Sequence, residues 1–118
     1  MINFLTEILS PGDQCVCVFI QQRGFQKNLV LDDSGGISKS GIWKLNEMEM
    51  AGVNKVVIYY RHDGINEIFI GNYKGISPTI FHDHYCINFQ ILQRDETLSD
   101  WSVFRDADSS LVKYFQLS

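Results

Sequence analysis

One segment constrains the fold more than any other part of the chain. Residues 55–73 read KVVIYYRHDGINEIFIGNY, two runs rich in β-branched and aromatic residues on either side of Asp63-Gly64. Such runs fit a pleated sheet, and Asp-Gly supplies the positive φ angles that a tight hairpin needs. In the first run, the side chains that alternate to both faces are largely apolar. We therefore predict a hairpin in the middle of a sheet that is covered on both sides, with Ile58 and Ile70 buried.

The rest of the chain reads as further short strands with few helical signals. Strands are expected at 14–22, 25–31, 42–45 and 85–92, and a strand or short helix at 111–117. Residues 2–9 have the apolar spacing of a short helix. Asn46 begins a helical turn as its N-cap, with Glu49 at the capping-box position. The segment 74–81 contains a proline and is expected to be a loop.

These elements predict the class of fold. The 118 residues include 45 % hydrophobic and 13 % aromatic residues, enough for one domain, residues 1–118, with its own core. Short connections without long crossover helices argue against a doubly wound parallel sheet. We expect an α+β fold with a curved, mainly antiparallel sheet, partly closed like a barrel, and one or two short helices.

Composition also predicts the compartment. The chain begins without a basic segment followed by an apolar one, and no apolar run approaches the roughly 18 residues of a membrane helix. Three cysteines, an odd number, favour reduced thiols without a disulfide. A cytoplasmic protein that does not associate with membranes is expected.

Charge points to the kind of partner. Lys and Arg number 10 against 14 Asp and Glu, a net charge of −4, whereas nucleic-acid binders usually carry a basic face. An acidic protein suits a basic protein partner. Asp95, Glu96 and Asp100 precede Trp101, which would place an apolar anchor inside an acidic rim. These four residues are the predicted binding surface; the alternative is a solvated loop with Trp101 packed inward.

Metal binding and catalysis have weaker support in the sequence. In an extended segment His82, His84 and Cys86 share one face and would be the ligands of any metal site. The usual CxxC spacing of zinc sites is absent, and Cys15 and Cys17 are interpreted as small core residues. No metal site is therefore predicted.

The candidate residues for acid–base catalysis also lack the partners that such chemistry needs. The pairs His62-Asp63 and His82-Asp83 lack the positioned third group that general acid–base catalysis requires. Residues 32–36 (DDSGG) match neither a calcium loop nor a phosphate loop and read as a turn. We expect no catalytic residues and no cofactor.

Two functional hypotheses remain open. The stretch that runs from residues 41–43 (GIW) through residues 67–76 (EIFIGNYKGI), about a third of the chain, resembles small PUA-like β-barrel domains, which read modified nucleotides and often accompany restriction nucleases. That resemblance implies a base pocket lined by aromatic residues such as Trp43 and Tyr73.

The preferred hypothesis is a non-catalytic binding protein. In size, acidity and strand content the chain is similar to bacterial immunity proteins (antitoxins) and phage-borne inhibitors, which block a toxin or nuclease by direct contact. A contiguous acidic patch would favour the inhibitor, and a basic groove with exposed aromatic residues would favour the nucleotide reader.

Overall fold

The computed structural model of the chain describes residues 9–21, 29–32, 34–62, 64–96 and 112–116. Its elements are β1 (Gln14–Gln21), β2 (Leu29–Val30), β3 (Ser38–Lys44), α2 (Glu47–Met50), β4 (Lys55–His62), β5 (Ile65–Pro78), β6 (His84–Glu96) and β7 (Val112–Gln116). None of the helices in the described part of the chain is long and apolar enough to cross a membrane.

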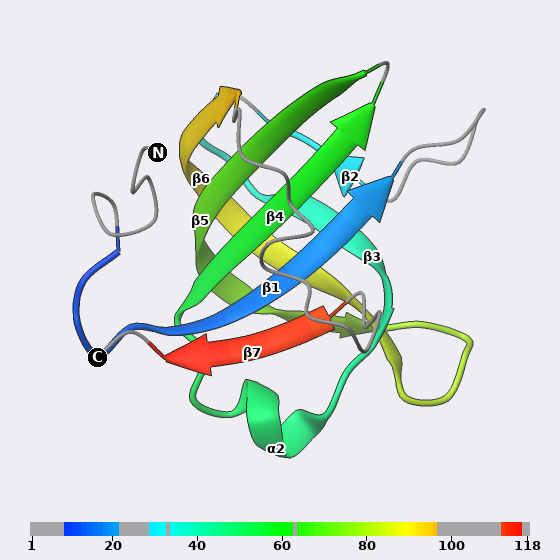
Figure 1. Cartoon of the computed structure of the whole chain (residues 1–118). Coiled ribbons are helices and arrows are strands. Elements are labelled where there is room, and N and C mark those ends of the chain that lie inside the picture. Colours follow the sequence, from blue (N-terminus) through cyan, green and yellow to red (C-terminus); the bar gives the residue numbers. More distant parts are fainter. Residues whose placement is uncertain (1–8, 22–28, 33, 63, 97–111, 117–118) are drawn as a thin grey trace.

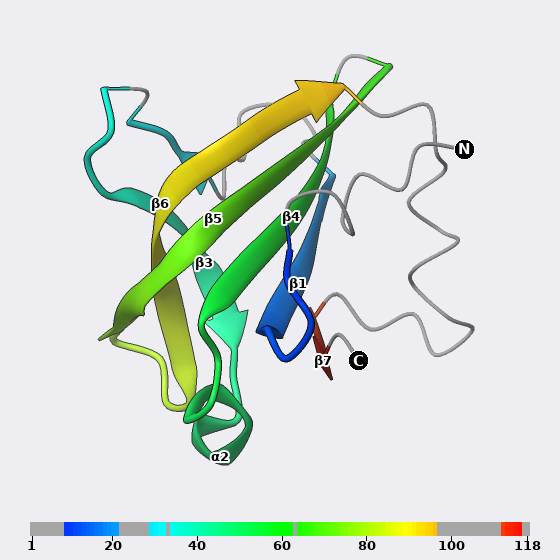
Figure 2. The same ribbon diagram turned by 90° about the vertical axis from the view of Figure 1, so that its left-hand side faces the viewer.

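The strands form one curled sheet in the order β2-β3-β6-β5-β4-β1-β7. Neighbours are antiparallel except β1 and β4, which run parallel with Cys15 opposite Lys55 and Gln21 opposite Arg61. Figures 1 and 2 show the sheet bent into a half-barrel, with α2 at one end and the β4–β5 turn at the other. The predicted α+β class and the curved, mainly antiparallel sheet are confirmed.

Two glycines allow the sheet to bend. The register between strands shifts between Ile70 and Gly71 and between Ser40 and Trp43. A Cβ atom at Gly71 would lie 2.6 Å from a backbone carbonyl oxygen of β6, and one at Gly41 would lie 2.7 Å from a Cα atom of the same strand. Because only glycine permits this approach, these positions let neighbouring strands come close where the sheet bulges.

Both faces of the central strands are buried. The inner cluster draws on β1–β6 and on Met50 of α2, and so fills the inside of the curled sheet. The outer cluster consists of Leu9, Cys15, Cys17, Phe19, Val57, Tyr59, Ile68 and Ile70. Ile58 and Ile70 are fully buried on opposite faces, which confirms the central hairpin. The interpretation of Cys15 and Cys17 as core residues is also confirmed.

Other predictions need correction at the ends of elements. The segment 74–81 is not all loop, because β5 continues to Pro78, which pairs with Tyr85 at the end of the strand, where a proline is tolerated. Strand β6 extends beyond residue 92 to Glu96. Within the segment 111–117, which was expected to be a strand or short helix, Val112–Gln116 form a strand, β7. The helix expected at 2–9 and most of the strand expected at 25–31 lie outside the described residues.

Candidate functional site

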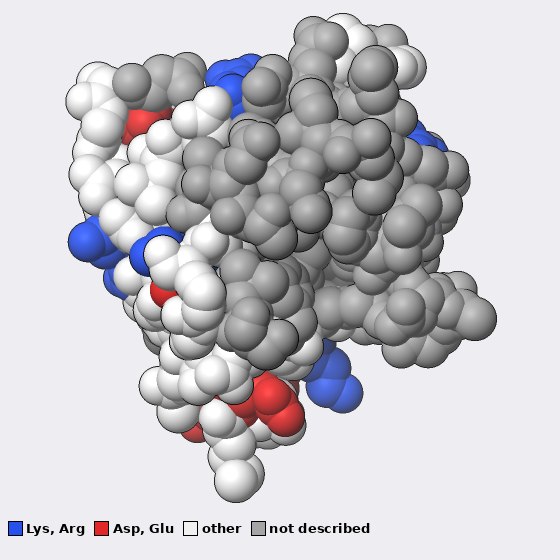
Figure 3. Space-filling model, turned by 60° about the vertical axis from the view of Figure 1, so that its left-hand side comes forward, with Lys and Arg blue, Asp and Glu red and all other residues white. Residues whose placement is uncertain are grey.

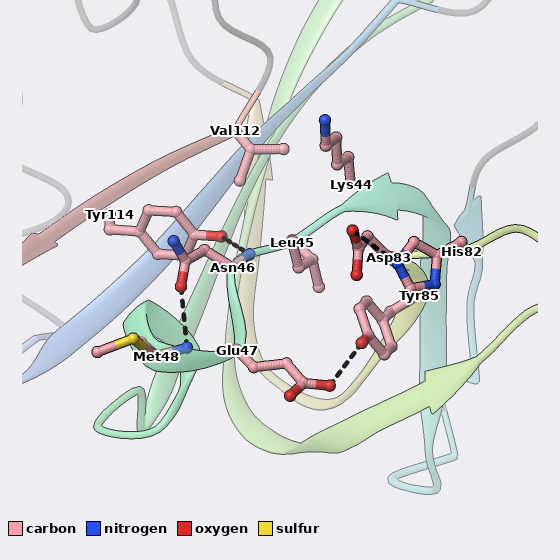
Figure 4. Close-up of a pocket in the computed structure, with 10 residues that line it drawn as sticks. All are labelled: Lys44, Leu45, Asn46, Glu47, Met48, His82, Asp83, Tyr85, Val112 and Tyr114. Atoms are coloured by element: carbon pink, nitrogen blue, oxygen red, sulfur yellow. Dashed lines mark hydrogen bonds and ion pairs between the residues drawn. The ribbon is translucent and has the colours of Figure 1, made fainter.

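A pocket of about 750 Å³ opens at the α2 end of the half-barrel. Its walls come from three distant parts of the sequence: residues 44–48, residues 82–85 and β7. Figure 4 shows α2 facing the start of β6 across this space, with Tyr114 of β7 above α2 in this view.

Hydrogen bonds join α2 to both strands that flank the pocket. Asn46 caps the helix as predicted, since its side chain accepts from the backbone N–H groups of Met48 and Glu49 at 2.9 and 3.2 Å. The Asn46 N–H donates to the Tyr114 hydroxyl at 3.1 Å, and the Tyr85 hydroxyl donates to Glu47 Oε1 at 2.6 Å. A helix of one turn cannot hold its place by its own backbone bonds, so these contacts position it.

The turn 79–83, on the other side of the pocket, is held by its own polar groups. The Thr79 hydroxyl donates to the His84 carbonyl at 2.9 Å and accepts from Phe81 N–H at 3.1 Å, and His84 N–H donates to the Phe81 carbonyl at 3.2 Å. Asp83 adopts a φ of +60°, a left-handed conformation that Asp tolerates better than most residues. Its carbonyl accepts from Leu45 N–H at 3.2 Å, which fixes the turn against the end of β3.

Large apolar side chains are exposed to solvent on both α2 and the turn 79–83. Met48 is 88 % exposed on α2, while Ile80 and Phe81 are 93 % and 55 % exposed in the turn. We call α2 and the turn 79–83 together the α2 rim. Its apolar side chains are displayed from hydrogen-bonded backbone at the same end of the molecule.

Acidic groups accompany the apolar ones on the α2 rim. Glu47 and Glu49 lie on α2 and Asp83 in the turn. Figure 3 shows acidic side chains gathered at the lower end of the molecule, at the level of α2. Lys44 and His82 also line the pocket, and His82 Nε2 lies 3.3 Å from Asp83 Oδ2.

The two tyrosines of the pocket both have raised pKa values, for different main reasons. The hydrogen bond to Glu47 is the main cause that raises the pKa of Tyr85, with smaller contributions from burial and from the charges of Glu47 and Asp83. Burial chiefly raises the pKa of Tyr114, the charge of Glu49 adds to the increase, and the hydrogen bond from Asn46 N–H opposes it. Both hydroxyls therefore stay protonated and neutral near pH 7.

The binding residues predicted from the sequence lie elsewhere. Asp95 and Glu96 end β6 beside the β4–β5 hairpin, where Glu96 pairs with Glu67, at the end of the sheet opposite α2. Their side chains, and all of Asp100 and Trp101, are outside the described part of the structure. That surface therefore stays a prediction.

The conditional metal ligands are not brought together. His82 points into solvent beside Asp83, His84 Nδ1 lies 2.7 Å from the His82 carbonyl oxygen, and Cys86 is half-buried against Gly41. Within the described residues, no three His, Cys, Asp or Glu side chains are grouped so that they could hold a metal ion. All three cysteines fall within the described ranges, and each is a thiol.

The aromatic residues implied by the PUA-like resemblance lie in the core. Trp43 is buried, and its Nε1–H donates to Ser40 Oγ at 3.0 Å. Tyr73 packs against the inner cluster, and burial raises its pKa. The exposed aromatic side chain of the α2 rim is instead that of Phe81, and the half-buried Tyr85 lines the pocket. The sequence analysis singled out neither residue. The sequence signals that pointed to this part of the chain were the N-cap at Asn46 and the His82-Asp83 pair, which was considered for metal binding and acid–base chemistry.

Comparisons with known proteins identified no relative of this chain. No family model matches the chain, and searches of curated proteins and of solved structures found no match.

Proposed function

We propose that this protein is a non-catalytic binding protein that neutralises a basic protein, such as a toxin or nuclease, by direct contact through the α2 rim. The observation that carries the proposal is the display of Met48 and Ile80, 88 % and 93 % exposed, from backbone held by hydrogen bonds. Such a protein would act as an immunity protein or a phage-type inhibitor.

Exposed apolar side chains on ordered backbone are typical of binding surfaces. Apolar surface in water gains free energy when a partner covers it, and a side chain on fixed backbone loses less entropy on binding than one on a mobile loop. Met and aromatic residues are enriched at interface cores, where a few such side chains supply most of the binding energy. Met48 and Phe81 supply these residue types on the α2 rim, and Ile80 adds further exposed apolar surface.

The acidic groups of the rim support a basic partner. Glu47, Glu49 and Asp83 lie on the same two segments as the exposed apolar side chains, and the chain as a whole has a net charge of −4. Complementary charge speeds association and selects among partners more than it adds affinity. The buried thiols of Cys15 and Cys17 suit a reducing compartment, so the proposal places the protein in the cytoplasm.

The proposal is tested by charge insertion at the rim. Met48→Asp and Ile80→Asp would be compared with Val30→Asp, which alters a 64 % exposed apolar side chain on β2. Each purified protein is titrated against a panel of basic nucleases and toxins, with binding and inhibition measured together. For a partner that the wild type inhibits, the rim variants should bind at least about 30-fold more weakly, the effect of losing a hot spot.

The control separates the rim from a general charge effect. Val30→Asp should change affinity by less than about twofold, as expected of a side chain outside an interface. Equal losses in all three variants, or none in the rim variants, would contradict the assignment of the interface. Wild-type affinity for a modified-base oligonucleotide, with none for any protein of the panel, would favour the nucleotide reader instead.

A further inference from the structure

The α2-rim pocket combines features that suit one kind of side chain. In Figure 4 the ring of Tyr85 lies between the carboxylates of Glu47 and Asp83, and the pocket also contains the apolar side chains of Leu45 and Val112. Its volume of about 750 Å³ is ample for a long side chain. The amine of Lys44 extends away from Glu47 and Tyr85 in the same view.

We infer, resting on the proposed function, that this pocket receives an arginine side chain of the protein partner. The carboxylates of Glu47 and Asp83 would accept hydrogen bonds from the guanidinium group, whose flat face would lie on the Tyr85 ring. The aliphatic stem of the arginine would pass over Leu45 and Val112.

The chemistry of the lining favours a guanidinium over other groups. Glu47 uses one oxygen to accept from Tyr85, and a carboxylate has acceptor capacity for further donors. Guanidinium donates in a planar fork that matches carboxylates, stacks on aromatic faces, and sheds water more readily than an ammonium group. The hydrogen bond to Glu47 is the main cause that raises the pKa of Tyr85, and the charges of Glu47 and Asp83 make a smaller contribution, which a bound cation would offset.

Binding of N-acetyl-arginine amide to the full chain provides the test. An NMR titration of backbone amides should show saturable shifts at residues 45–48 and 83–85. The expected dissociation constant is on the order of 1 mM, as for an efficient ligand of about 15 non-hydrogen atoms. The citrulline analogue has the same shape without the charge and should bind at least about 10-fold more weakly.

Variants assign the binding to particular side chains. Glu47→Gln and Asp83→Asn should each weaken arginine binding at least fivefold. Glu49→Gln is the matched control, because Glu49 lies on the same helix but outside this pocket, and it should change binding by less than twofold. Absence of shifts up to about 20 mM, equal shifts with citrulline, or an equal loss in Glu49→Gln would each overturn the arginine pocket.

The same variants separate this inference from the proposed function. If Asp83→Asn and Glu47→Gln bind the protein partner as the wild type does while Ile80→Asp does not, the rim is the interface but the pocket holds no arginine. If Ile80→Asp retains partner binding, the proposed interface fails, whatever the peptide titration shows.

Discussion

Asn54 joins the two strands of the parallel pair, and its replacement tests how far that pairing depends on one polar side chain. Its Oδ1 accepts from Gln14 N–H and its Nδ2 donates to Asp13 Oδ1, each at 2.8 Å. Asn54→Ala removes both bonds but leaves the backbone bond from Asn54 N–H to the Gln14 carbonyl, at 2.9 Å. A neutral hydrogen bond contributes about 1 kcal/mol and one to a charged group about 1.5–3 kcal/mol.

The two contributions together should be smaller at an exposed residue, because water can replace the lost hydrogen-bond partners. Asn54 is exposed, so we expect Asn54→Ala to reduce the free energy of unfolding by about 1–2 kcal/mol at pH 7, measured by urea denaturation. A double-mutant cycle with Asp13→Ala should give a coupling of about 0.5–1.5 kcal/mol. This cycle isolates the bond between the two side chains from the rest of the effect.

Acid provides an independent check of the same bond. Hydrogen bonds from Ser10 N–H and, second, from Asn54 hold the pKa of Asp13 below its ordinary value of 3.8. The ionised carboxylate therefore stabilises the folded state fully above pH 3.8, and this contribution is lost as the pH falls through the lowered pKa. The difference between wild type and Asn54→Ala should shrink over that range. A difference below about 0.5 kcal/mol at pH 7, or one that does not change with acid, would refute the reasoning.

Three further predictions concern the core, the buried thiol and the acidic end of β6. Ile58→Ala should lower the free energy of unfolding by about 2–5 kcal/mol, measured by urea denaturation, because Ile58 is fully buried. Ile65→Ala, at a 39 % exposed position of the same hairpin, should lower it by well under half as much. Similar losses in the two variants would refute the central position of β4. Burial, followed by the charge of a nearby carboxylate, raises the pKa of Cys15 from 9.0 to about 11, so unfolded chains ionise first. The free energy of unfolding should therefore fall by about 2 kcal/mol between pH 9 and 11, and this part of the pH dependence should vanish in Cys15→Ala. If the acidic surface predicted from the sequence also contacts a basic partner, Glu96→Lys with Asp100→Lys should slow association at low salt and leave the unfolding transition unchanged; unaltered association excludes that surface.

The sequence alone determined the features that depend on neighbouring residues. The hairpin follows from two β-prone runs around Asp-Gly, and the helical turn follows from Asn46, whose side chain bonds only two and three residues ahead. The two-sided apolar pattern of β4 also predicted burial of Ile58, because side chains alternate between faces whatever the strand pairs with. These inferences need no knowledge of distant contacts.

Only the tertiary structure decided which strands are neighbours and what they bring together. The parallel pairing of β1 with β4 joins segments about 40 residues apart, and β5 continues to Pro78 because β6 offers it a partner. The pocket likewise combines Glu47, Tyr85 and Tyr114, whose spacing along the chain carries no signal. The sequence also did not predict the exposure of Ile80, because an apolar residue gives the same sequence pattern whether its side chain is buried or exposed to solvent. The hairpin and the cap are local in sequence, whereas the candidate site depends on long-range contacts that local patterns do not encode.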